Sequence, residues 1–154
     1  MNPVFFIKFL LFIKIWSFLN LIIFEYLTKY KMNNIALLLI RIVFAGSMLY
    51  GHGLSKFYRL IEGNLSFANP IGIGEAPTLV LAVFSEFLAP LFILIGYKTK
   101  IFSFFPAATM FVAAFIVHLS DPFARKEKAI LFLIGFIVIM MMGPGKYSVD
   151  RKFS

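Results

Sequence analysis

Two ionisable side chains interrupt long apolar stretches, where a charge is costly and therefore calls for a partner. Arg41 lies inside the stretch from Asn34 to Leu54, and Glu86 lies near the middle of the stretch from Pro77 to Gly96. In a bilayer such groups usually face the protein interior and pair with one another. If the stretches are antiparallel helices, each charge lies about ten residues, or ~15 Å, from the helix end at the same membrane surface. We therefore predict a buried Arg41–Glu86 ion pair, which either only fixes helix register or also serves a function.

A second polar group is predicted where the same helices reach one membrane surface. Its members are His52, Lys56, Glu75, His118, Asp121 and Glu127. Histidines and carboxylates are metal-ligand types, but no tight ligand spacing links these residues, and we expect no metal site. The functional interpretation is a polar mouth over a pocket for a small lipophilic or anionic molecule. The structural interpretation is a set of capped helix ends and surface hydrogen bonds.

Five apolar stretches must position these residues, at 4–24, 34–54, 77–96, 101–117 and 129–143. A helix needs about 20 residues to cross the hydrocarbon core, and flanking lysines can extend the shorter stretches. The stretches are continuously apolar and do not alternate, which favours helices over the strands of a barrel. The prediction is an all-α protein, a transmembrane four-helix bundle with an additional N-terminal hydrophobic helix.

The first stretch differs from the others because polar residues interrupt it, namely Lys8, Lys14, Ser17, Asn20 and Glu25. Three of them recur every third residue and share roughly one helical side. The stretch either spans the bilayer or lies in its surface as an amphipathic helix. Alternatively, Met32 is the true start and the preceding residues are a start-site artefact. We therefore divide the chain into an N-terminal helix at 1–31 and a membrane domain at 32–154.

Composition supports a membrane protein and argues against other classes. Hydrophobic residues make up 61% of the chain and charged residues 14%, whereas soluble domains average about 45–50% and about 25%. The net charge of +8 gathers at the ends of the apolar stretches, as expected beside anionic lipid head groups. Binding to nucleic acid would need a basic face on a soluble fold and is not expected. The chain has no cysteine, so electrons in any redox chemistry must pass through a bound molecule or a partner.

The positive-inside rule predicts the orientation of the last four stretches. One set of helix ends carries Lys29, Lys31, Lys98, Lys100, Lys146, Arg151 and Lys152. The opposite set carries Lys56, Arg59, Arg125, Lys126 and Lys128. The first set is larger, so we place it in the cytoplasm.

Several strings resemble the DoxX family of small bacterial membrane proteins. They are RIVFAGSMLYGHGLSKF, EFLAPLFILIGYKTK, EKAILFL and the closing GPGKYSVD, in that order over residues 33–150. The resemblance implies a multi-pass four-helix bundle in the bacterial cytoplasmic (inner) membrane. The matching family positions are Arg41, His52, Gly53, Lys56, Glu86, Gly96, His118, Glu127, Gly143, Pro144, Gly145, Ser148 and Asp150. After Glu86 the chain departs from the family's glycine-containing pattern and carries Ala89 and Pro90.

The resemblance also implies a function, because related members are linked to thiosulfate–quinone oxidoreduction and to oxidative-stress membrane complexes. We accordingly expect a membrane subunit of a redox-associated complex, with a quinone as cofactor or a membrane or peripheral redox protein as partner. One alternative is a scaffold without chemistry of its own. Another is a small proton-coupled transporter with Glu86 as the proton site, although a neighbouring Arg41 would hold that carboxylate ionised. No catalytic residue is predicted.

Overall fold

A computed structural model describes the backbone of residues 3–152 and the side chains of residues 14–152 other than 27 and 30. Within this part of the chain the regular structure is entirely helical, which confirms the all-α prediction. The chain divides between Ile35 and Ala36 into two compact units. The predicted domain boundary after residue 31 and the alternative start at Met32 remain predictions.

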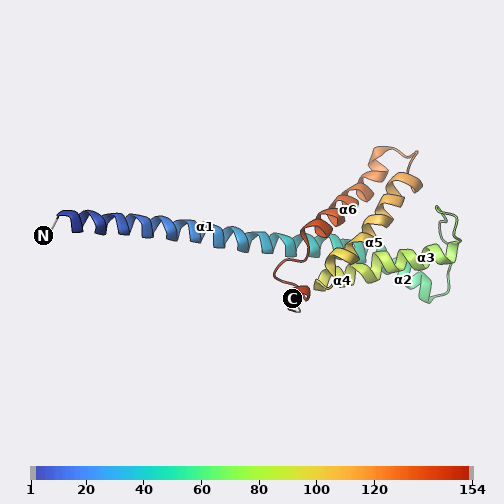
Figure 1. The fold of residues 1–154 in the computed structure, drawn as a ribbon. Coiled ribbons are helices and arrows are strands. Elements are labelled where there is room, and N and C mark those ends of the chain that lie inside the picture. The colour runs from blue at the N-terminus through green and yellow to red at the C-terminus, as the bar shows by residue number, and fades with distance from the viewer. Residues whose placement is uncertain (1–2, 153–154) are drawn as a thin grey trace. The chain divides into compact units, whose positions relative to one another are not determined.

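Helix α1 (Pro3–Met48) begins in the first unit (Figure 1). Polar side chains in this part of the helix bond to its own backbone. Asn20 Nδ2 donates to the Trp16 carbonyl at 3.0 Å, and Thr28 Oγ1 donates to the Glu25 carbonyl at 3.2 Å. Such bonds satisfy polar groups without a partner from another helix. Whether this stretch crosses the bilayer remains a prediction, and the side chain of Lys8 lies outside the described ones.

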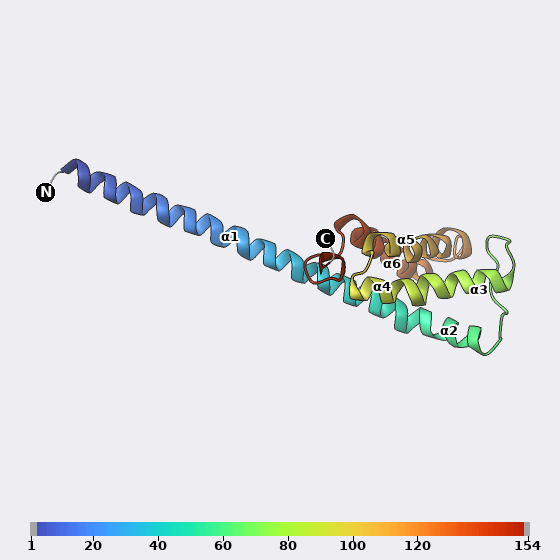
Figure 2. The same ribbon diagram turned by 60° about the horizontal axis from the view of Figure 1, so that its bottom comes forward.

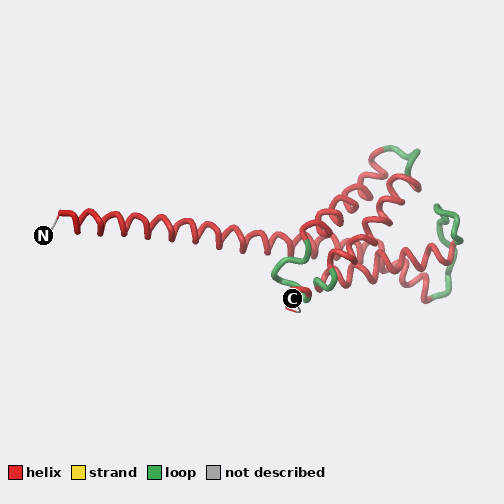
Figure 3. The backbone as a smooth tube through the Cα atoms, viewed as in Figure 1, coloured by secondary structure: helices red, strands yellow, loops and turns green. Residues whose placement is uncertain are grey.

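The second unit contains four helical rods joined by turns and loops at their ends (Figures 2 and 3). The first rod is the end of α1 with η1 (Leu49–Gly53) and α2 (Leu54–Ile61). The second is α3 (Glu75–Val83), η2 (Phe84–Leu88) and α4 (Ala89–Ile95). The third is α5 (Thr99–Val112) with η3 (Ala113–Val117), and the fourth is α6 (Phe123–Met142). The segments η1, η2 and η3 are π-helical, and the 3-10 turn η4 (Asp150–Lys152) follows the fourth rod.

Three helices among the described residues are long and apolar enough to cross a membrane, at Lys14–Ile61, Glu75–Ile95 and Thr99–Val117. Helix α6 has 20 residues, but its first turns carry Arg125, Lys126, Glu127 and Lys128. These charges shorten the apolar part of α6. The protein is therefore an all-α membrane protein with several spans, and the fourth transmembrane helix of the predicted bundle remains a prediction.

Small residues allow the rods of the second unit to approach closely. Helices α5 and α6 lie side by side in Figures 1 and 2, and the core between the rods includes Ala107, Ala114 and Ala129. A Cβ added at Gly135 of α6 would lie 2.1 Å from the ring of Phe44 on α1. Glycine at this position therefore lets the aromatic ring fill the interface, as small residues do between membrane helices.

Candidate functional site

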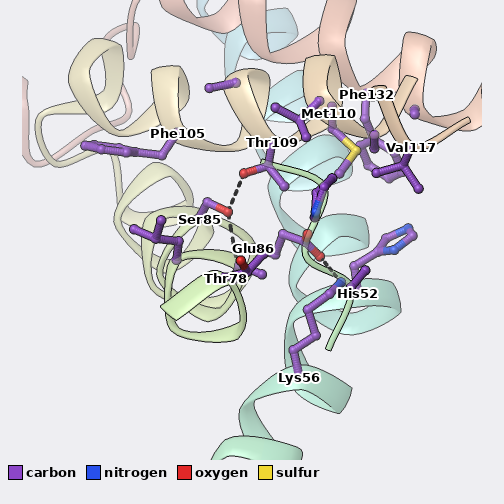
Figure 4. A pocket seen from close by; sticks show the side chains of 18 of the residues that line it. His52, Lys56, Thr78, Ser85, Glu86, Phe105, Thr109, Met110, Val117 and Phe132 are labelled. Atoms are coloured by element: carbon purple, nitrogen blue, oxygen red, sulfur yellow. Dashed lines mark hydrogen bonds and ion pairs between the residues drawn. The ribbon is translucent and has the colours of Figure 1, made fainter. Parts of the chain in front are cut away.

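The carboxylate of Glu86 pairs with Lys56 inside the second unit. Lys56 Nζ on α2 donates to Glu86 Oε2 on η2, and the side chains are 18% and 4% exposed (Figure 4). An ionised group at this burial requires a compensating charge. The structure thus supplies Glu86 with a partner, but from a lysine close to the end of the first rod.

The predicted ion pair between Arg41 and Glu86 is wrong. The Arg41 guanidinium donates to backbone carbonyls, from Nε to Ile93 at 3.0 Å and from Nη2 to Leu94 at 2.8 Å. The prediction assumed that the first rod ends near Gly51, whereas η1 and α2 continue it to Ile61. Arg41 therefore lies about 20 residues, or ~30 Å, from that end. It is level with the end of α4, and Glu86 is level with Lys56.

Arg41 joins the end of α4 to the segment 143–152, which we call the tail. Its Nη1 donates to the carbonyls of Pro144 and, at 3.0 Å, Tyr147. The last carbonyls of a helix have no partner within the helix. The guanidinium supplies one to Leu94 and is a second donor to Ile93, whose carbonyl also accepts from the Gly96 N–H at 3.1 Å. A single buried side chain thus satisfies carbonyls from two segments far apart in sequence.

Further bonds fasten the tail to the turn between α4 and α5. The Asp150 carboxylate accepts from the N–H of Lys98 at 2.7 Å and of Thr99 at 3.1 Å, which caps the start of α5. The Asp150 N–H donates to the Gly96 carbonyl at 2.9 Å. Gly96 has a φ of 77°, and a Cβ there would lie 2.5 Å from the Ser148 Cβ. The family resemblance pointed to Gly96, Ser148 and Asp150, but not to the contacts that these residues make.

A cavity of about 600 Å³ opens beside the Lys56–Glu86 pair (Figure 4). Its walls are mainly apolar and come from all four rods and from the loop between α2 and α3. They include Phe67, Ile71, Leu81, Phe84, Phe105, Met110, Val117 and Phe132. Each π-helical segment contributes, with His52 on η1, Ser85 on η2 and Ala113 on η3. Such π turns often occur at functional sites because they redirect side chains out of the regular helical ladder.

The polar part of the cavity consists of a few groups in fixed positions. Ser85 Oγ and Thr109 Oγ1 are 2.7 Å apart and join η2 to α5 (Figure 4). The His52 ring meets the ring of Phe132 edge-on, with centroids 5.6 Å apart. Sequence reasoning missed Ser85 and Thr109, although each is a polar residue inside an apolar stretch. A few converging polar groups in an apolar pocket are typical of small-molecule sites.

His118, Arg125 and Lys128 also line the cavity, and Asp121 links the first two of them. His118 Nδ1 donates to Asp121 Oδ2 at 2.8 Å, and Arg125 Nη1 lies 3.4 Å from Asp121 Oδ1. The bond from His118 lowers the pKa of the Asp121 carboxyl below its ordinary value, and the charge of Arg125 adds to this effect. These residues form a charged cluster between α5 and α6.

The structure brings together part of the predicted polar mouth. His52, Lys56 and His118 line the cavity, and Asp121 contacts His118. Glu75 instead lies 3.4 Å from the N–H of Phe67 in the loop. Glu127 is exposed and does not line the cavity. Among the described residues no three His, Asp or Glu side chains gather as a metal would require. That the cavity binds a ligand remains a prediction.

The helical fold, the candidate spans and the internally paired charges define an integral membrane protein. The family model described as DoxX matches residues 36–119. This is more than half of the chain, and the chain therefore belongs to the DoxX family. The match covers three of the rods that form the cavity.

A curated relative extends this comparison. The inner membrane protein YqjF of Escherichia coli strain K12 is 33% identical in an alignment of 79 positions that covers 47% of this chain. The aligned part covers 59% of the relative's length, which is less than two thirds. No solved structure matches the chain. The family and the candidate spans identify a multi-pass protein of the bacterial inner membrane.

Proposed function

We propose that this protein is the membrane subunit of a redox-associated complex and that its cavity binds a quinone. The observation that carries the proposal is the apolar cavity of about 600 Å³ with the Lys56–Glu86 pair at its edge. This volume lies within the ~300–1,000 Å³ typical of small-molecule sites. The cavity lies between rods that include candidate membrane spans, where a lipophilic molecule is concentrated.

The lining fits the chemistry of a quinone. A quinone has a flat ring with two carbonyl acceptors and an apolar tail, and when bound it supplies two-electron carrier chemistry. Lys56 Nζ and the hydroxyls of Ser85 and Thr109 are donors suited to the ring carbonyls. The rings of Phe84 and Phe105, 4.8 Å apart and edge-on, suit the apolar part. We assign the donors to orientation and the aromatic wall to exclusion of water.

The Lys56–Glu86 pair gives the site a group that can hold a proton. Lys56 Nζ donates to Glu86 Oε2 in surroundings with little exposure to water. Charge-assisted hydrogen bonds of this kind are stronger than neutral ones and fix the geometry of both partners. We assign Glu86 the role of positioning Lys56 and balancing its charge.

The proposal also requires a partner protein. With no cysteine in the chain, thiol chemistry cannot deliver electrons to the cavity. We therefore propose that a membrane or peripheral redox protein exchanges electrons with the bound quinone. The charged cluster of His118, Asp121 and Arg125 lies outside the candidate spans and is accessible to such a partner.

Quinone retention tests the proposal. The protein is purified in native-lipid nanodiscs, and extracted quinone is measured per chain by mass spectrometry. Ala108→Phe fills the cavity, and Ala124→Phe adds the same bulk at an exposed position of α6. We expect wild type and Ala124→Phe to retain about one quinone per chain, and Ala108→Phe to retain several-fold less. Quinone at the level of the bulk lipid in all three proteins would reject the proposal.

The Lys56–Glu86 pair also favours a second candidate, proton-coupled transport. The sequence argument against transport assumed that Arg41 neutralises Glu86, and the partner of this buried carboxylate is instead Lys56. Proteoliposomes loaded with a pH-sensitive dye distinguish the two functions. Transport predicts a proton flux that Glu86→Gln abolishes, whereas quinone binding without transport predicts none.

A further inference from the structure

We propose that the tail and the end of α4 bind the head group of an acidic phospholipid. A second hollow, of about 470 Å³, is lined by Ile95 and by tail residues. Three cations, Lys146, Arg151 and Lys152, contribute to its lining, and no carboxylate does. Basic pockets at the end of membrane helices are typical sites for phosphate-containing head groups.

The tail is held in shape before any lipid binds. Arg41 bonds to the carbonyls of Pro144 and Tyr147, and the Val149 N–H donates to the Ile95 carbonyl at 3.1 Å. The Asp150 carboxylate bonds to the backbone at the start of α5. A fixed backbone reduces the entropy that binding would otherwise cost.

An apolar surface for the acyl chains adjoins the basic hollow. Leu88, Leu91 and Ile95 are 40%, 38% and 54% exposed. Spacings of three and four residues place them along one side of the second rod. The exposed rings of Tyr97 and Tyr147 lie at the same end, as aromatic residues do at membrane interfaces. The head group therefore has cations and the acyl chains have an adjoining apolar side, a combination that fits a phospholipid.

A free phosphate ion or an acidic protein segment would use the cations without this apolar side. The two further cations of the α4–α5 turn, Lys98 and Lys100, are exposed at the same end. The positive-inside rule places this end in the cytoplasmic leaflet, which carries acidic lipid. We therefore assign the site to a phospholipid of that leaflet.

Lipid-dependent thermal unfolding of the detergent-solubilised full chain tests the proposal. Tm is followed during titration with phosphatidylglycerol, phosphatidylcholine or inorganic phosphate. The test variant is Arg151→Gln with Lys152→Gln, and the control is Lys29→Gln with Lys31→Gln. The control removes the same charge from the same predicted membrane side, outside the tail. All four residues are exposed, so both variants should keep the wild-type Tm in phosphatidylcholine.

We expect phosphatidylglycerol to raise the Tm of the wild type and the control at similar concentrations. The test variant should require an at least about tenfold higher phosphatidylglycerol concentration for the same rise in Tm, because each cation near the lipid surface contributes to binding. Three results would overturn the proposal. Phosphatidylcholine or inorganic phosphate could raise the Tm of the wild type as much as phosphatidylglycerol does, or the control variant could need as much extra phosphatidylglycerol as the test variant. A test variant with lowered Tm in phosphatidylcholine would make the tail a folding element and would also overturn it.

Discussion

The Lys56–Glu86 pair makes the stability of the protein around the cavity depend on two side chains that compensate each other's charge. Removal of one partner leaves a buried charge uncompensated, which typically costs about 3–5 kcal/mol. Removal of both leaves no charge and costs much less. Arg41 has a separate role, because its donors satisfy backbone carbonyls of α4 and the tail.

A double-mutant cycle measures the coupling between Lys56 and Glu86. Lys56→Met and Glu86→Gln should each lower the free energy of unfolding, and the double variant should recover part of the loss. We expect a coupling energy above ~1 kcal/mol for residues in direct contact. Chemical denaturation in detergent micelles measures it.

The control cycle pairs Arg41→Met with Glu86→Gln. These two residues share no hydrogen-bond partner, and their effects on unfolding should add to within ~0.5 kcal/mol. A large coupling of Glu86 to Arg41, with none to Lys56, would restore the ion pair that the sequence suggested.

Asp121 provides a prediction that depends on pH. The hydrogen bond from His118 lowers the pKa of Asp121 from its ordinary value of 3.8. Because the folded value is the lower one, this contact stabilises the folded state above pH 3.8 and its contribution disappears as the pH falls through the folded pKa. We expect His118→Phe to raise the pKa of Asp121, as measured by ¹³C NMR of the carboxyl carbon. An unchanged pKa in His118→Phe would contradict this assignment, and Lys126→Gln, which leaves the bond intact, serves as the control.

The sequence identified the costly residues correctly but not their partners. Arg41 and Glu86 are both buried, as expected for charges within apolar stretches. Their pairing was predicted wrongly because the first helix was expected to end near Gly51, beside His52 and Gly53. In the structure the helix continues through these residues as the π turn η1. Such a turn has no pattern in the sequence that distinguishes it from a helix end.

At the scale of elements, η1 and η2 touch through their backbones at Gly53. A Cβ at this position would lie 2.1 Å from the Glu86 carbonyl oxygen and 2.9 Å from the Phe87 Cα. Both neighbours are backbone atoms and cannot rotate away. Gly53 therefore fixes how closely Lys56 and Glu86 approach each other, and the close contact explains why glycine follows His52.

Alanine substitutions in η1 test this contact. Gly53→Ala should force η1 and η2 apart and destabilise the protein by about 1–3 kcal/mol, as overpacking does. Gly51→Ala is the matched control, because nothing lies within 4 Å of a Cβ there. Thermal unfolding of both variants in one detergent provides the comparison. Equal Tm values would show that the helices separate without cost and would contradict the close packing.

For the molecule as a whole, composition and apolar stretches were sufficient to predict an all-α membrane protein, and the resemblance to a known family added the inner membrane. The resemblance to DoxX proteins predicted the family, which the family match confirms. The number of transmembrane helices is harder to predict, because α6 begins with four charged residues and only its later turns are continuously apolar. The cavity could not be predicted either, since its lining comes from four rods and a loop whose packing no local pattern specifies.

Photolabelling with a quinone analogue shows directly whether the cavity binds a quinone. The protein in native-lipid nanodiscs is irradiated with an azido-quinone, and labelled peptides are identified by mass spectrometry. We predict labels on residues 78–86 and 105–117, reduced by excess unlabelled quinone and by Ala108→Phe. Labels that spread over exposed apolar residues such as Leu39, Ile42 and Val43, and that excess quinone does not reduce, would show that the cavity is not a quinone site.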